Sequence, residues 1–255
     1  MKYATYHSLA NARVLITGGG TGIGAAIVAA FAGQGAQVYF IDIAADASQA
    51  LADSLKDAPL PPKFLLCDLT DISALNATIA AIEADGGALD VLVNNAANDD
   101  RHTVAEVTEA YWDQRMAVNL RHHFFCAQAV AKGMAAKGGG SIINFGSISW
   151  HLALPNLSLY MTAKAAIEGL TRGLARDLGP DHIRVNTIIP GGIRTPRQQQ
   201  MWHSPEDEAK IVSSQCLPET VTVEDCAALA LFLASDNAAR CSGRDYYIDA
   251  GWYGA

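Results

Sequence analysis

The feature that most constrains the fold is a regular alternation of short apolar runs with longer Ala-rich segments. Runs of three to five residues, rich in β-branched and aromatic side chains, recur at Val14–Ile16, Val38–Ile41, Phe64–Leu66, Leu89–Val93, Ile142–Phe145, Val185–Ile189 and Tyr246–Ile248. Short apolar runs of this kind are typical of strands buried on both faces, and nearly every gap between them has a helical pattern. Because each helical crossover returns the chain in the same direction, the alternation predicts a parallel sheet. We expect a single α/β domain over residues 1–255, doubly wound, with seven parallel strands and helices on both faces.

The charge balance and the cysteines narrow the class of protein. The chain has 18 Lys and Arg against 26 Asp and Glu, a formal net charge of −8, and no long run of either sign. This balance disfavours nucleic acid or an anionic membrane as a partner, and no apolar run is long enough to span a bilayer. The five cysteines are widely spaced, without a CxxC pair or a Cys/His cluster that could hold a metal. They predict reduced thiols in a cytoplasmic protein, and we expect no metal centre.

One long connection interrupts the alternation. The segment 191–217 contains two prolines and is followed by a third, Pro218, and it has three consecutive glutamines and a short helical pattern at Glu206–Val212. Long connections of mixed character in compact folds often cover a binding site. We therefore expect this segment to act as a lid.

A glycine-rich loop follows the first strand. Residues 17–24 read Thr-Gly-Gly-Gly-Thr-Gly-Ile-Gly and lead directly into an Ala-rich helix. Glycine allows the sharp turn and lets a pyrophosphate approach backbone N–H groups at the positive end of the helix dipole. An ordinary glycine-rich turn is the alternative, but the strand before, the helix after and an acidic residue ending the next strand favour a dinucleotide site. The sheet is then Rossmann-like, and the loop residues expected to contact the cofactor are Gly18, Thr21, Gly22, Ile23 and Gly24.

The acidic residue is Asp42, which ends the strand Val38–Ile41. A carboxylate at this place accepts hydrogen bonds from the adenosine ribose hydroxyls and repels a 2′-phosphate. Neither Gly20-Thr21 nor Ile43-Ala44-Ala45 contains an Arg or Lys that could neutralise such a phosphate. We therefore expect NAD rather than NADP. For Asp42 alone, a helix N-cap or a solvated strand end is the alternative.

Three residues predict a catalytic centre. Tyr160 and Lys164 are four positions apart, so they share one face of a helix. A free phenol with a pKa of about 10 is a poor base near neutral pH, but a neighbouring ammonium and an oxidised nicotinamide ring would lower that pKa. Tyr and Lys at this spacing also occur as surface pairs. Ser147 favours catalysis, because it follows the buried strand Ile142–Phe145 at the edge where open α/β sheets bind ligands.

Together these motifs resemble, in their order and over essentially the whole chain, the short-chain dehydrogenase/reductase family. Besides the glycine loop and the Tyr160-x-x-x-Lys164 pair, the matching residues are Asn94-Asn95-Ala96, Asn119, Ser147 and Pro190-Gly191. The resemblance implies that Tyr160 is the general acid/base and that Ser147 holds the reacting oxygen. It also implies that Lys164 lowers the pKa of Tyr160 and binds the ribose, and that Asn119 positions a water in the proton relay.

The same resemblance implies further cofactor contacts and an assembly. The implied contacts are Asp68, Leu69, Asn95, Ala96, Tyr160, Lys164, Pro190, Gly191, Ile193 and Thr195. Ala97 departs from the pattern, since many relatives have Gly there, and its methyl group would lie near the cofactor. A homotetramer is implied as well. The apolar helical stretches Phe124–Met134 and Ala163–Leu174 support it, because they need cover beyond one sheet face.

Longer stretches resemble the bacterial aldose 1-dehydrogenases of this family, in particular those for D-xylose and L-arabinose. These stretches are residues 98–102, 144–151 and 247–252. A sugar needs short polar groups and an aromatic face for its C–H edges. The expected substrate contacts are Asn98, Asp99, Ser147, Ser149, His151 and Tyr160, with Gln199 and Trp202 from the lid. The resemblance implies NAD-dependent oxidation of a cyclic aldose, such as a pentose, at C1 to the lactone.

Several alternatives stay open. Residues 99–102 can form a solvated loop with an internal salt bridge, and His151 can be a packed, hydrogen-bonded histidine. The sugar can be L-fucose, D-galactose or L-rhamnose instead of a pentose. A 3-oxoacyl thioester reductase of the same family is another alternative, disfavoured by Asp42 and the polar residues. A non-catalytic protein on this fold is the last, disfavoured because all four catalytic positions are filled.

Overall fold

The computed structural model describes residues 3–195, 197–198 and 204–254. Its sheet has seven strands in the order β3-β2-β1-β4-β5-β6-β7, and every neighbouring pair is parallel. The prediction of a doubly wound parallel sheet is confirmed, and each expected run lies in or overlaps a strand. The strands are β1 (Arg13–Thr17), β2 (Gln37–Asp42), β3 (Lys63–Leu66), β4 (Val91–Asn94), β5 (Gly140–Phe145), β6 (Ile183–Pro190) and β7 (Asp245–Ile248).

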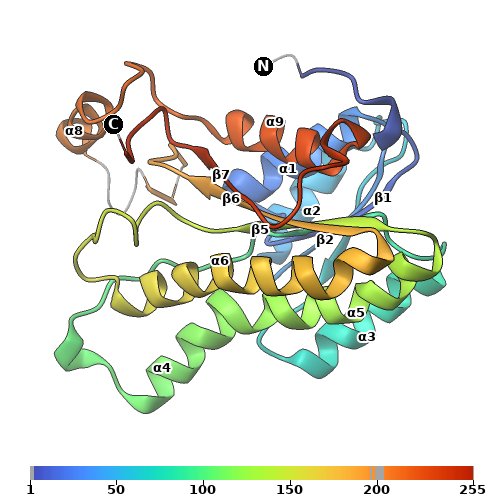
Figure 1. Ribbon diagram of the computed structural model, residues 1–255, viewed down its shortest axis with the longest axis horizontal. Coiled ribbons are helices and arrows are strands. Elements are labelled where there is room, and N and C mark those ends of the chain that lie inside the picture. The colour runs from blue at the N-terminus through green and yellow to red at the C-terminus, as the bar shows by residue number, and fades with distance from the viewer. Residues whose placement is uncertain (1–2, 196, 199–203, 255) are drawn as a thin grey trace.

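Helices cover both faces of the sheet (Figure 1). On one face lie α1 (Gly22–Gly33), α2 (Ala45–Ser54) and α9 (Val223–Ala234). On the other face lie α3 (Ile72–Ala84), α5 (His122–Ala136) and α6 (Ser158–Leu178). The helix α4 (Glu109–Met116) leads through a π-helical turn (Ala117–Arg121) into α5, and α8 (Pro205–Ser213) lies in the expected lid segment. No helix within the described ranges is long and apolar enough to cross a membrane.

The strands separate two apolar cores. Along β1, Val14 and Ile16 pack into the core shared with α1 and α9, whereas Leu15 packs into the core shared with α3 and α5. All three are fully buried. Successive side chains of a strand point to opposite faces, and full burial of such a side chain contributes about 1.5–3 kcal/mol. This is why the strands are apolar at nearly every position instead of alternating with polar residues.

The strand order creates a crevice at the carboxyl edge of the sheet. β1 pairs with β2 on one side and with β4 on the other, so the direction of winding reverses there. Crossovers that leave β1 and β4 toward opposite faces open a gap beyond the strand ends, and open α/β sheets bind ligands in that gap. Thr17 and Asn94 end the two strands side by side.

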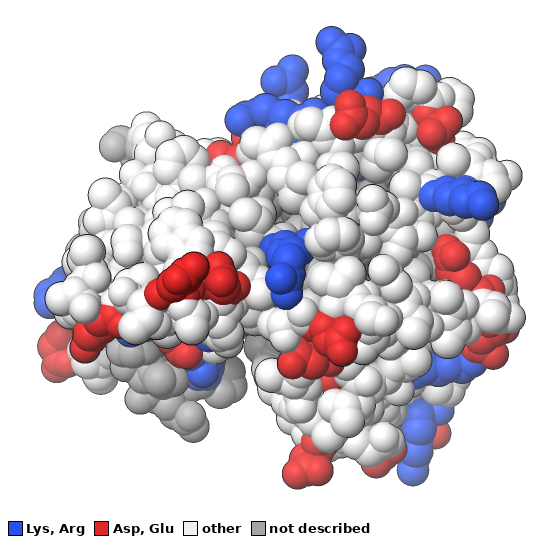
Figure 2. Space-filling view, turned by 90° about the horizontal axis from the view of Figure 1, so that it is seen from below, with Lys and Arg blue, Asp and Glu red and all other residues white. Residues whose placement is uncertain are grey.

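The surface shows no dominant charge on the face drawn in Figure 2. Acidic and basic side chains are interspersed there, with wide uncharged areas between them. This distribution agrees with the absence of long charge runs in the sequence.

Candidate active site

A cavity of about 800 Å³ lies at the carboxyl edge of the sheet. It receives residues from the glycine loop, from the ends of β2, β4, β5 and β6, and from α6 and α8. Every residue expected to contact the cofactor lines it except Gly22. The predicted catalytic residues Ser147, Tyr160 and Lys164 line the same cavity.

The glycine loop is packed too closely for side chains. Gly18 has a φ of +64°, and a Cβ there would lie 2.7 Å from Cα of Ala96. A Cβ on Gly24 would lie 1.9 Å from the carbonyl oxygen of Gly18. The helix α1 begins at Gly22, and its N-cap Thr21 makes no side-chain capping bond. The first N–H groups of α1 are thus left for an anion at the loop, which fits a dinucleotide pyrophosphate.

Asn95 joins the glycine loop to β4. Its side-chain amide donates to the carbonyl oxygens of Thr17 and Gly18 at 3.1 and 2.9 Å. The backbone N–H groups of Asn95 and Ala96 donate to the Thr17 hydroxyl at 3.0 and 3.1 Å. The sequence indicates Asn95 as a cofactor contact, and the structure adds that its side chain fixes the loop on which the cofactor would lie.

Asp42 supports the loop from the next strand. Its Oδ2 accepts from the Gly20 N–H at 2.8 Å, and its Oδ1 accepts from the Ala44 N–H at 2.9 Å. A Cβ on Gly20 would lie 2.3 Å from the Ser48 hydroxyl and 3.0 Å from Oδ2 of Asp42. A larger residue at position 20 would have to displace the Ser48 hydroxyl and would press against the carboxylate. Each carboxylate oxygen keeps acceptor capacity for a ribose hydroxyl, so both interpretations of Asp42, as a loop support and as a ribose contact, are compatible with the geometry.

The catalytic candidates converge from two elements. Ser147 follows β5, and its hydroxyl donates to the Ser149 hydroxyl at 3.0 Å. Tyr160 lies in the first turn of α6, on the same helix as Lys164, as their spacing predicts. Lys164 lies one turn later, with its Nζ 5.5 Å from the centre of the Tyr160 ring. That Nζ donates to the carbonyl oxygen of Phe145, the last residue of β5, at 2.7 Å.

Burial dominates the electrostatics of this pair. It raises the pKa of Tyr160 above its usual value, the Asp99 carboxylate adds to the rise, and a hydrogen bond with Ser147 opposes it. Burial also lowers the pKa of Lys164 to about 7, against an opposing effect of Asp99. The protein by itself therefore favours the neutral phenol of Tyr160. Deprotonation near neutral pH has to be supported by the positive charge that an oxidised nicotinamide brings when it binds.

The buried Lys164 predicts a pH-dependent stability. Below pH 7 both the folded and the unfolded chain carry a charged Lys164, so the cost of burying the charge is present in full. Between pH 7 and 10.5, the usual lysine pKa, the folded chain binds fewer protons than the unfolded chain, and its stability rises with pH. Lys164→Met removes this contribution. We expect the melting temperature of the variant minus that of the wild type, both without cofactor, to fall steadily from pH 7 to pH 10.

The change of this difference in melting temperature with pH reports the pKa of Lys164, whereas its absolute size does not. Lys164→Met also leaves the Phe145 carbonyl oxygen without its donor, which lowers stability equally at every pH. A difference in melting temperature that stays constant from pH 7 to pH 10 would show that Lys164 keeps an ordinary pKa.

Asn119 is buried in the π-helical turn between α4 and α5. Its Oδ1 accepts from the backbone N–H of Asn98 at 2.8 Å, which holds the loop that follows β4. Its Nδ2 has no partner among the described residues. Asn119 does not line the cavity, so its expected contact with a relay water stays a prediction.

The loop after β4 contributes polar residues to the cavity. Asn98 and Asp99, two of the expected substrate contacts, line it together with Ser149. Arg197 joins this loop from the lid segment, with its Nε 3.3 Å from Asp99 and its Nη2 2.7 Å from Asp100. Gln198 donates to Asp99 at 2.7 Å. Asp99 and Asp100 thus pair with Arg197 of the segment 191–217, and Asp100 also pairs with Arg115 of α4 at 3.2 Å. Gln199 and Trp202 lie outside the described residues.

Comparison with known proteins agrees with this geometry. The family described as Enoyl-(Acyl carrier protein) reductase matches residues 18–253. The chain is 58% identical over 252 residues to the D-xylose 1-dehydrogenase of Caulobacter vibrioides (strain NA1000 / CB15N), which covers 99% of this chain and 100% of that protein. The chain belongs to the short-chain dehydrogenase/reductase family. It is an oxidoreductase that uses a nicotinamide cofactor.

Other members of the short-chain dehydrogenase/reductase family are similar over nearly the full length. The chain is 48% identical over 239 residues to the probable galactose dehydrogenase of Rhizobium meliloti (strain 1021), with 93% of each chain covered. The solved gluconate 5-dehydrogenase of Burkholderia cenocepacia J2315 matches with a TM-score of 0.89 and 29% identity, covering 96% of this chain and 97% of that one. That structure contains NADP and tartrate.

Several cavity residues of this short-chain dehydrogenase/reductase were not predicted. Leu154, Leu157 and Trp252 are apolar residues that line the cavity. Trp252 ends the stretch 247–252 that resembles the aldose 1-dehydrogenases, so the sequence carried a signal for it. Leu154 and Leu157 lie in an irregular loop in which Ala153 and Asn156 have positive φ, and no periodicity marks such positions.

His151 does not line the cavity with the other predicted substrate contacts. Its side chain is 5% exposed, and its ring centre lies 3.8 Å from that of Trp150. Nε2 of His151 lies 2.9 Å from Glu168 and 3.1 Å from the Tyr247 hydroxyl. The geometry corresponds to the alternative of a packed, hydrogen-bonded histidine.

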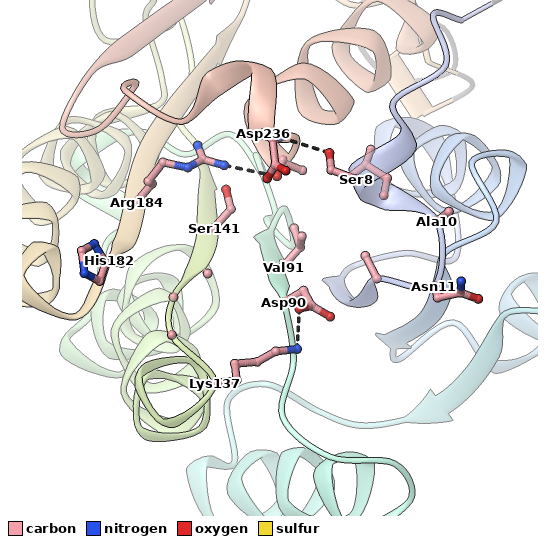
Figure 3. A pocket seen from close by; sticks show the side chains of 16 residues that line it. Ser8, Ala10, Asn11, Asp90, Val91, Lys137, Ser141, His182, Arg184 and Asp236 are labelled. Carbon is pink, nitrogen blue, oxygen red and sulfur yellow. Dashed lines mark hydrogen bonds and ion pairs between the residues drawn. The ribbon is translucent and has the colours of Figure 1, made fainter.

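A second cavity, of about 540 Å³, lies at the opposite edge of the sheet, where β4, β5 and β6 begin (Figure 3). Lys137 forms an ion pair with Asp90 across it, and the Arg184 guanidinium donates to the carbonyl oxygens of Leu233, Ala234 and Ser235. Asp236 is held by its backbone N–H, which donates to Ser8 at 3.1 Å. Lys137 and Arg184 in this cavity are thus engaged by protein groups.

Proposed function

We propose that this enzyme oxidises a cyclic aldose at C1 to the lactone, with NAD as the cofactor and a pentose such as D-xylose or L-arabinose as the substrate. The observation that carries the proposal is the convergence of Ser147, Tyr160 and Lys164 in one cavity that both polar and apolar residues line. Asn98, Asp99 and Ser149 suit sugar hydroxyls. Leu154, Leu157 and Trp252 suit the C–H edges of the ring. Full-length similarity to a D-xylose 1-dehydrogenase and to a probable galactose dehydrogenase supports an aldose.

The roles of the three residues follow from their chemistry. Tyr160, as phenolate, takes the proton of the anomeric hydroxyl. Ser147 donates a hydrogen bond to the same oxygen and holds it toward Tyr160. Lys164, one helical turn away, adds positive charge near the phenolate and contacts the ribose. The nicotinamide cofactor, when bound, would accept the C1 hydrogen as a hydride, and C1 would become the carbonyl carbon of the lactone.

We propose NAD because of the surroundings of Asp42. Its carboxylate is fixed at the end of β2 by two backbone N–H groups. No Lys or Arg occurs anywhere between Arg13 and Lys56, so neither the glycine loop nor α2 offers a cation for a 2′-phosphate. The related gluconate 5-dehydrogenase was solved with NADP, so the family alone does not decide between the two cofactors.

A substrate panel tests the proposed reaction. Initial rates with NAD are measured for D-xylose, L-arabinose, D-galactose, D-glucose and an aliphatic secondary alcohol, and for reduction of an acetoacetyl thioester. We expect kcat/KM to be highest for a pentose. The margin over hexoses should be about 10- to 200-fold at most, because excluding one carbon group contributes only about 1–3 kcal/mol. Oxidation of the secondary alcohol without any aldose, or preferred reduction of the thioester, would refute the proposal.

Three further properties complete the proposal. The segment 191–217 acts as a lid, since Thr195, Arg197 and Ile211 line the cavity. Four copies assemble in the cytoplasm. The exposed Trp112 and Phe124, at 44% and 42%, are apolar side chains of α4 and α5 that a second copy would cover.

A further inference from the structure

Glu168 is a buried carboxyl group outside the cavity. It lies on α6, one turn after Lys164 and two turns after Tyr160, and is 5% exposed. Burying a carboxyl group is costly unless it is hydrogen-bonded, so its partners indicate what it does.

The partners of Glu168 come from the segment that carries Ser147. The indole N–H of Trp150 donates to Oε1 of Glu168 at 2.6 Å, and Nε2 of His151 lies 2.9 Å from the same oxygen. Trp150 and His151 do not line the cavity, whereas their neighbours Ser147 and Ser149 do. Within this segment, residues 147–149 line the cavity, whereas residues 150 and 151 are hydrogen-bonded to Glu168 of α6.

The segment depends on such an attachment because it has no regular secondary structure after β5. Its backbone is joined to β6 by the N–H of Ile148, which donates to the Pro190 carbonyl oxygen at 3.1 Å. Glu168 provides the side-chain link to α6. One carboxyl oxygen therefore connects the segment of Ser147 to the helix of Tyr160 and Lys164.

We propose that Glu168 is a positioning residue that sets the distance between Ser147 and Tyr160 by clamping Trp150 and His151 to α6. This inference rests on the proposed roles of Ser147 and Tyr160. Two groups that act on one oxygen have to stay within hydrogen-bond reach of it, and a displacement of about 1 Å can lower turnover about 100-fold. Glu168 touches neither the cavity nor the reacting atoms, so it acts on turnover and leaves cofactor binding unaffected.

The variants Glu168→Ala, Glu168→Gln and Tyr247→Phe test this clamp, by which we mean the attachment of Trp150 and His151 to Glu168. Ala removes the acceptor. Gln keeps a carbonyl oxygen in place of Oε1, which can accept from both Trp150 and His151. Tyr247→Phe is the matched control, because it deletes the hydroxyl 3.1 Å from Nε2 of His151 and leaves both bonds to Glu168 in place. For each, kcat and KM for the aldose are measured, with the dissociation constant of NAD.

We expect Glu168→Ala to lower kcat about 10- to 100-fold at an unchanged dissociation constant for NAD. Glu168→Gln should recover most of kcat, and Tyr247→Phe should resemble the wild type. Equal losses in Ala and Gln, wild-type kcat in Ala, or a loss in Ala that appears in NAD binding instead of kcat would each overturn the proposal.

A readout independent of turnover separates this inference from the proposed function. Amide hydrogen exchange of residues 146–154 is followed in the same variants. We expect faster exchange there in Glu168→Ala than in the wild type, and wild-type exchange in Glu168→Gln. Equal protection in the Ala variant would refute the clamp even if the enzyme oxidises aldoses. If the wild type oxidises no aldose, the proposed function fails while the exchange result still decides the clamp.

Discussion

Replacing Tyr160 with Phe is expected to lower turnover of the aldose about 100- to 10,000-fold, the usual effect of losing a general acid/base. The change removes only the hydroxyl, so the ring stays packed in the first turn of α6 beside Lys164. We therefore expect the fold and the dissociation constant of NAD to be unchanged. Turnover and NAD binding are measured on the same preparation.

Ser147→Ala is a companion to this variant. Ser147 holds the oxygen while Tyr160 moves the proton, so the two losses should be strongly non-additive in the double variant. Turnover of Tyr160→Phe within about tenfold of the wild type would contradict the assigned mechanism, since general acid/base catalysis contributes at least about 100-fold.

Replacing Asp42 with Ala is expected to narrow the preference for NAD over NADP. The variant loses the hydrogen bonds to the ribose hydroxyls, and bonds to a charged group contribute about 1.5–3 kcal/mol, or about 10- to 100-fold in kcat/KM with NAD. The value with NADP should rise, because the repulsion of the 2′-phosphate is removed. Both values are measured at one ionic strength, since charge repulsion depends on salt.

Asp42→Asn is the control for damage to the glycine loop. Asp42 also accepts from the N–H groups of Gly20 and Ala44, so Ala weakens the loop as well as the ribose site. Asn removes the charge and retains one carbonyl oxygen, and it should raise kcat/KM with NADP with a smaller loss of melting temperature. A wild-type enzyme that uses NADP as well as NAD would contradict this interpretation of Asp42.

The fold could be predicted almost completely because its signals are local. A strand buried on both faces has to be apolar along its whole length, and a parallel neighbour requires a helix between the two strands. Such patterns are visible without knowledge of contacts. What differed were the bounds of the strands, by at most two residues: β4, for example, begins at Val91 and not at Leu89.

For the candidate site, too, the features with local signals could be predicted from the sequence, whereas the long-range contacts could not. The sequence by itself determined the glycine loop, the acidic end of β2 and the Tyr160 and Lys164 pair, because covalent spacing and helical periodicity fix where these groups lie. Only the tertiary structure decided that Asp99 pairs with Arg197, 98 positions away, and that His151 attaches to Glu168 instead of facing the cavity. The side chains of an irregular segment turn toward whichever distant element packs against them, and no local pattern encodes that choice.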